Sequence, residues 1–156
     1  KEQIKIPIIA AGGIGTGRGM LAVMVLGADG VQVGSRFAAS LESSAHINFK
    51  ETILEVKEGG TQLTLKELAP VRLIKNKFFD DLQELYGQCP SKEELITFLG
   101  RARAKRGMFE GNLVDGELEI GQIAGLINEI KSAESIVLEM ITEFKTAQNE
   151  VTKFLL

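Results

Sequence analysis

Two short apolar runs near the start of the chain each end in glycine. The first covers residues 6–14 (IPIIAAGGI) and the second covers residues 30–37 (GVQVGSRF). Runs of this length without polar alternation are typical of strands buried on both faces of a parallel sheet. Residues 18–27 lie between them and predict one short helix that stops at Gly27. The pattern therefore predicts a strand–helix–strand unit whose two strands end on the same side of the sheet.

The rest of the chain is predicted to be mostly helical. Periodic apolar positions and end signals predict a strand at 61–65 and helices at 48–58, 71–86 and 92–105. An apolar stripe from Ile136 to Phe144 predicts a further helix at the C-terminal end. The fold class expected is α/β. We place residues 1–156 in one domain, with 60–118 as a candidate helical excursion from it.

The glycines that end the two strands predict a phosphate-binding site. Glycine allows the backbone to approach an anion closely, and parallel strands bring both loops to one edge of the sheet. The glycine spacing fits neither the dinucleotide fingerprint nor the P-loop, but it fits the phosphate site at the last two strands of a (β/α)8 barrel. The alternative is that these glycines serve tight turns only. The candidate binding residues are Ala11, Gly12, Gly13, Gln32, Val33, Gly34 and Ser35.

Composition places the chain in an ordinary globular class. It has 44% apolar residues, 25% charged residues and a net charge of −3. This mild acidity gives no reason to expect nucleic acid or an anionic membrane as a partner, and no apolar run reaches the ~20 residues that a membrane span needs. The single cysteine, Cys89, predicts a cytoplasmic location.

Several segments together resemble the nitronate monooxygenase family, formerly the 2-nitropropane dioxygenases, which includes the flavin-type enoyl-ACP reductases. The segments lie in the same order along nearly the whole chain: IPIIAAGGIGTGRGM (6–20), GADGVQVGSRF (27–37), ESSAHINFK (42–50), PVRLIKN (70–76) and GQIAGL (121–126).

The resemblance implies an FMN-dependent oxidoreductase with a TIM-barrel fold, a small-molecule carbon acid as substrate and NAD(P)H as a candidate reductant. A barrel needs ~250 residues, so the 156 residues here look like the C-terminal half, beginning at the seventh strand. The catalytic histidine and the ring-binding strands are then expected upstream of Lys1, in a missing N-terminal half that would be this chain's first partner. A homo-oligomer is left open.

Three other functions are weighed against this one. The enoyl-ACP reductases carry Met-Ala before the last glycine segment, where this chain has Glu119 and Ile120. Inosine monophosphate dehydrogenase-like barrels carry an aspartate before the glycine pair, where this chain has Ala11. The third alternative is a half-barrel that acts only in association. The residues upstream of Lys1 would test the dehydrogenase-like alternative, and whether the isolated chain is soluble and monomeric would test the association module.

Three further features have both a functional and a structural interpretation. His46 is the only histidine, and we expect it to order its loop rather than to act as a base. The basic cluster of Arg101, Arg103, Lys105 and Arg106 could bind a nicotinamide phosphate or an acidic carrier protein, but a solvated helix end is favoured. Gly121 either starts a helix whose free amides face the ligand or packs beneath the barrel mouth.

Overall fold

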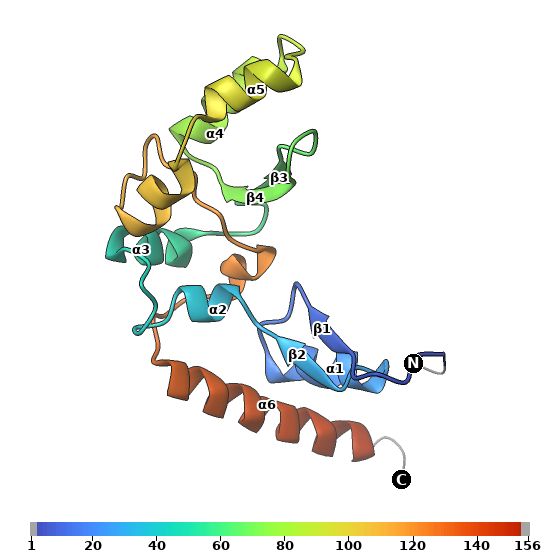
Figure 1. The fold of residues 1–156 in the computed structure, drawn as a ribbon. Coiled ribbons are helices and arrows are strands. Elements are labelled where there is room, and N and C mark those ends of the chain that lie inside the picture. Colours follow the sequence, from blue (N-terminus) through green and yellow to red (C-terminus); the bar gives the residue numbers. More distant parts are fainter. Residues whose placement is uncertain (1–2, 154–156) are drawn as a thin grey trace.

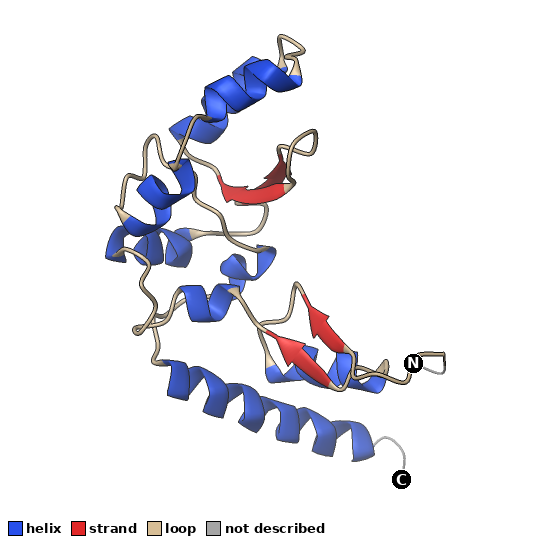
Figure 2. Cartoon of the chain, in the orientation of Figure 1, coloured by secondary structure: helices blue, strands red, loops and turns tan. Residues whose placement is uncertain are grey.

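The first part of the chain forms the predicted strand–helix–strand unit. The structure is a computed structural model that describes residues 3–153 and shows an α/β fold. Strands β1 (Ile9–Ala11) and β2 (Gly30–Gln32) pair in parallel, and helix α1 (Gly17–Val25) connects them. The prediction of two parallel strands and one short helix is confirmed (Figures 1 and 2).

The long C-terminal helix α6 (Ala133–Lys153) runs beneath this unit (Figure 1). A Cβ added to Gly17 would lie 2.0 Å from the carbonyl oxygen of Met140, so α1 and α6 touch backbone to backbone at this point. Ile14, Ile136 and Met140 form the small buried cluster between them.

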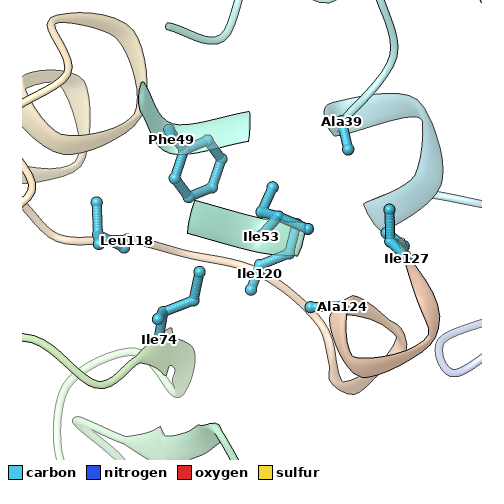
Figure 3. Packing of buried hydrophobic residues seen from close by; sticks show 8 residues of the cluster. All are labelled: Ala39, Phe49, Ile53, Ile74, Leu118, Ile120, Ala124 and Ile127. Carbon is cyan, nitrogen blue, oxygen red and sulfur yellow. The ribbon is translucent and has the colours of Figure 1, made fainter. Parts of the chain in front are cut away.

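The middle of the molecule holds its central hydrophobic core. Helices α2 (Ser35–Ala38) and α3 (Ile47–Glu55) meet the 3₁₀ helix η2 (Gln122–Leu126) there. Figure 3 shows the side chains pointing into the same space from these elements and from the segment before η2. The cluster consists of Ala39, Phe49, Ile53, Ile74, Leu118, Ile120, Ala124 and Ile127.

A β-hairpin follows α3, and its second strand corrects the sequence-based prediction. Strands β3 (Thr61–Thr64) and β4 (Val71–Ile74) pair antiparallel, whereas 71–86 had been predicted to be all helix. The helix α4 (Lys77–Tyr86) begins only after Asn76, whose extended backbone and side chain cap it. Thr61 pairs with Ile74 and Thr64 with Val71, and this pairing with β3 holds residues 71–74 in an extended conformation.

Helix α5 is also shorter than the predicted 92–105. It spans Lys92–Leu99, with the expected cap at Ser91, and it ends at Gly100, whose φ of +64° an α-helix cannot contain. A single π-helical turn, η1 (Lys105–Phe109), follows after a break.

The segment 60–118 is therefore a hairpin followed by helices, not a helical excursion alone. It has its own buried cluster, to which β4, α4 and α5 contribute, while the end of β4 packs into the central core. Whether this segment is a separate domain stays a prediction.

Candidate functional site

The ends of β1 and β2 bring the predicted phosphate-binding residues together. Ala11 and Gln32 are opposite each other in the last register position of the pair. The first glycine loop, residues 12–16, and the second glycine loop, residues 33–34, therefore leave the sheet side by side, as the pattern predicted. Val33 is half-buried and packs toward the cluster beneath the sheet.

The backbone of the first glycine loop needs glycine at two positions. Gly12 has a φ of +88° and Gly13 has a φ of +71°, in the left-handed region that other residues rarely adopt. A Cβ built on Gly12, Gly13 or Gly34 would meet nothing within 4 Å. The glycines of both loops thus border open space rather than packed atoms. This arrangement suits close approach of an anion to backbone amides.

The second glycine loop runs directly into α2. Gly34 is the N-cap residue of this four-residue helix and Ser35 is its first residue. The Ser35 hydroxyl accepts a hydrogen bond from the backbone N–H of Gly121 at 3.2 Å. Gly121 is therefore tied to the second loop. Its own amide is engaged by protein, in keeping with the packing interpretation of this glycine, while Gln122 begins η2.

Sequence reasoning missed the side chains that lie behind the two loops. Arg36, next to Ser35, donates to the carbonyl oxygen of Gly15 and to the carboxylate of Glu139 on α6. Glu143, one turn further along α6, accepts from the backbone N–H of Gly17. Glu139 and Glu143 stand four residues apart beside the predicted apolar stripe of the C-terminal helix. That spacing is the signal that could have drawn attention to them.

His46 has the structural role that its sequence context predicted. Its Nδ1 accepts a hydrogen bond from the backbone N–H of Asn48 and caps α3. The backbone N–H of His46 donates to the carbonyl oxygen of Met108. A Cβ on Gly111 would lie 2.4 Å from the imidazole ring, so the ring packs closely against that glycine.

The basic cluster is not a simple solvated helix end, because Arg103 is built into the fold. Its guanidinium lies over the rings of Phe78 and Phe98, with its carbon 4.7 Å and 5.4 Å from their centroids. It also donates to the carbonyl oxygens of Leu99 and Asp115, among others. A side chain held in this way stabilises the packing of α4 on α5 and has little freedom to bind a cofactor.

Two carboxyl groups lie in an apolar environment just before Gly121. Glu117 is buried, and the pKa of its carboxyl group is raised to about 7, mainly by the loss of solvation. Repulsion from Glu119 contributes a smaller part of this rise in pKa, and attraction from Arg103 opposes it. Burial also raises the pKa of half-buried Glu119. Their strand-like segment pairs with β4 through Leu73 and Glu119.

Residues 3–153 show neither a metal-binding cluster nor a membrane-spanning helix. They contain no group of three or more His, Cys, Asp or Glu side chains arranged to hold a metal ion. No helix within the same residues has the length and apolar character that crossing a membrane requires.

Comparison with known proteins places this geometry in a family. The family model described as nitronate monooxygenase matches residues 1–143. A probable nitronate monooxygenase of Staphylococcus saprophyticus is 35% identical over 149 residues, which are 95% of this chain and 41% of that protein. The chain thus spans less than half the length of this relative.

Solved structures give the same result. FabK from Thermotoga maritima matches with a TM-score of 0.88 and 36% identity, over 98% of this chain and 49% of that one. The nitroalkane oxidase from Streptomyces ansochromogenes matches with a TM-score of 0.75 and 27% identity, over 96% of this chain and 42% of that one. On the match to its family model and to these relatives, the chain belongs to the nitronate monooxygenase family.

Proposed function

We propose that this chain supplies the flavin phosphate site of an FMN-dependent oxidoreductase that oxidises a small carbon acid, as nitronate monooxygenases do. The observation that carries the proposal is the pair of glycine loops at adjacent parallel strand ends, with open space over Gly12, Gly13 and Gly34. Family membership supplies the flavin chemistry. The fold proposed for the complete protein is a (β/α)8 barrel of which this chain is the C-terminal half.

The residues present fit a flavin phosphate. Backbone amides of Gly12, Gly13, Gly34 and Ser35 would hold it, since hydrogen bonds to a dianion are of the strong, charge-assisted kind. Ala11, Gln32 and Val33 set the two loops at the strand ends. When bound, FMN supplies the transfer of electrons between substrate and oxidant. This chain anchors the cofactor, and the catalytic histidine lies in the N-terminal half.

The phosphate site is tested by substitution in the complete protein. Gly34→Val, at a φ of −101°, adds a side chain without backbone strain, whereas Gly13→Val adds strain as well. Each should weaken FMN binding about fivefold or more, because the new side chain occupies the phosphate space; a lost charge-assisted contact is of this size. Flavin fluorescence titration measures the affinity.

Gly59→Val is the matched control. Gly59 has a φ of +72°, almost that of Gly13, and its Cβ would also meet nothing within 4 Å, but it lies in the turn before β3. It should lower stability as Gly13→Val does and leave FMN affinity unchanged. Wild-type affinity in both folded loop variants would contradict the phosphate site.

Reduction of an enoyl thioester is the second candidate function. The resemblance of the sequence segments to a family that includes the flavin-type enoyl-ACP reductases favours it. Glu119 and Ile120, in place of Met-Ala, count against it. Oxygen consumption with a nitronate, compared with NAD(P)H oxidation driven by an enoyl thioester, distinguishes the two in the complete protein.

The proposed compartment is the cytoplasm, given one free cysteine.

A further inference from the structure

We propose that Arg36 and Glu139 are positioning residues that fix the two glycine loops relative to each other, and that Glu143 holds the first loop against α6. None of the three side chains is assigned a contact with the flavin. The inference rests on the proposed flavin phosphate site and adds the device that sets its geometry. In this inference the affinity for the flavin phosphate depends on helix α6. Its Glu139 lies 103 residues after Arg36, and its Glu143 lies 126 residues after Gly17.

Arg36 connects the two loops directly. It follows Ser35 in α2, and its Nη1 donates to the carbonyl oxygen of Gly15 at 3.1 Å. Its Nη2 donates to Oε2 of Glu139 at 2.9 Å. The Arg36 side chain is only 13% exposed, so both bonds are shielded from solvent. A planar guanidinium with two fixed acceptors holds the second loop at a set distance from the first.

Glu139 anchors this guanidinium to α6. Its carboxylate also accepts from Nζ of Lys131 at 2.8 Å. The hydrogen bond from Lys131, followed by that from Arg36, lowers the pKa of Glu139, so the carboxylate is ionised at neutral pH. The charge of Arg36 is therefore balanced inside the protein. Its role is to orient the loops rather than to attract the phosphate.

Glu143 makes the second attachment of α6. Its Oε2 accepts from the backbone N–H of Gly17 at 2.6 Å, immediately after the first glycine loop. Thr16 caps the same helix end by accepting from the N–H of Gly19. These two acceptors engage the backbone N–H groups of Gly17 and Gly19 at the N-terminus of α1. The two N–H groups are therefore bonded to protein, and the proposed phosphate contacts stay with the loop amides.

A small polar cavity of about 130 Å³ lies beside the two attachments and is bordered by the first glycine loop, by α6 and by residues 123–131. Arg36, Glu139, Glu143 and Gly15 are among the residues that line it. Both loops also pack on the small buried cluster of Ile14, Ile136 and Met140, which Val33 borders. This apolar packing holds the loops on α6, and the directional hydrogen bonds of Arg36, Glu139 and Glu143 set their orientation. Loss of these hydrogen bonds should displace the loops without dismantling the core.

The experiment titrates FMN and riboflavin into the complete protein and follows flavin fluorescence. Riboflavin has the same ring but no phosphate. Glu139→Ala and Glu143→Ala should each lower FMN affinity about fivefold or more, in the range of typical coupling between sites, and leave riboflavin affinity unchanged. Glu139→Gln and Glu143→Gln keep an acceptor oxygen and should recover part of the affinity.

Glu150→Ala is the matched control on the same helix. Glu150 pairs with Arg18 at 2.6 Å across the α1–α6 contact, both side chains are well exposed, and the bond of Glu150 goes to α1 rather than to a glycine loop. This variant should bind both flavins as the wild type does.

An equal loss of FMN and riboflavin affinity would overturn the inference, because it would show a general structural effect. So would a Glu150→Ala variant as weak for FMN as Glu139→Ala, or alanine and glutamine variants with wild-type FMN affinity. If an alanine variant does not fold, its glutamine counterpart gives the FMN-to-riboflavin comparison. A wild-type protein that binds neither flavin would overturn the proposed function itself, and the inference with it.

Discussion

At the scale of single residues, Glu117 is a carboxyl group whose ionisation is disfavoured by its burial. It is 6% exposed, and burial raises its pKa to about 7. A carboxyl group whose pKa is higher in the folded protein than in the unfolded chain binds its proton more tightly when folded. Its contribution to stability is then complete below the unfolded pKa and is lost as the pH rises through about 7.

Glu117→Gln should therefore stabilise the protein at pH 8 and have little effect at pH 4. The expected gain at pH 8 is on the order of 1–3 kcal/mol, because the amide never carries the buried charge. Thermal unfolding of the complete protein at several pH values measures it. Glu51→Gln, at an exposed position of α3, is the control and should change little. A stability difference between Glu117→Gln and wild type that does not vary with pH would contradict the raised pKa.

His46 should contribute to stability rather than to turnover. His46→Ala removes the cap of α3 and the ring that packs on Gly111, at a cost of about 1–2 kcal/mol. His46→Asn keeps a capping oxygen and should recover part of the loss. Unfolding temperature and turnover, measured on the same samples, separate the two roles. A His46→Ala protein with wild-type unfolding temperature and negligible activity would show that His46 acts in catalysis and contradict its structural role.

At the scale of elements, Asn76 joins β4 to α4 and to a distant segment. Its Oδ1 accepts from the N–H of Phe79 at 3.0 Å, and its Nδ2 donates to the carbonyl oxygens of Leu113 and Gly116, each at 2.8 Å. One amide side chain thus caps a helix and satisfies two backbone carbonyls at once.

Asn76→Ala should destabilise the protein by about 2–4 kcal/mol, because it removes a cap and leaves two carbonyls without their donor. Ser91→Ala is the matched control. It removes the cap of α5, with no donation to another segment, and should cost about 1 kcal/mol. Urea unfolding of both variants gives the comparison. Equal losses would show that the donations from Asn76 to residues 113–116 contribute nothing.

The element boundaries show what local pattern can and cannot predict. Strands β1 and β2 were predictable because each is a continuous apolar run with glycine at its end. The residues of β4 were predicted as helix because Val71, Leu73 and Ile74 fit the apolar spacing of the α4 stripe as well as that of a strand. Antiparallel pairing with β3 settled them as strand, a contact between two segments that the periodicity of residues 71–86 alone does not contain. Helix α5 ends at Gly100, which has a positive φ. A glycine at this place is a helix stop signal in the sequence, and the predicted helix was extended past it to residue 105.

The candidate site likewise has a part that the sequence pattern predicted and a part that it did not. The glycine loops were found from the sequence because each lies within one contiguous motif. The bond between Arg36 and Glu139 joins residues 103 positions apart and was not found, because nothing in either segment points to the other. The glycine loops at the two strand ends were therefore predictable, and the contacts between these loops and α6 required the structure.

At the scale of the whole molecule, the β1–β2 unit leaves a large part of its apolar surface uncovered. Ile6, which precedes β1, is 71% exposed, and Ile9, the first residue of β1, is 56% exposed. Val25 and Leu26, at the end of α1, are 76% and 84% exposed. Figure 1 shows β1 and β2 with no further strand beside either of them. Exposed strand edges pair readily with other chains, and apolar surface of this kind drives association.

Residues 1–156 expressed alone should therefore not form a stable monomer with a competent FMN site. We expect them to associate through the open strand edges, to aggregate, or to bind the N-terminal half when the two are produced together. Light scattering after size-exclusion chromatography gives the mass in solution, and absorbance gives the flavin content. The co-produced halves are the positive control, because the added strands would cover Ile6 and Ile9 and should restore flavin binding. A monomer of residues 1–156 that binds FMN tightly would show that these exposed strands need no partner.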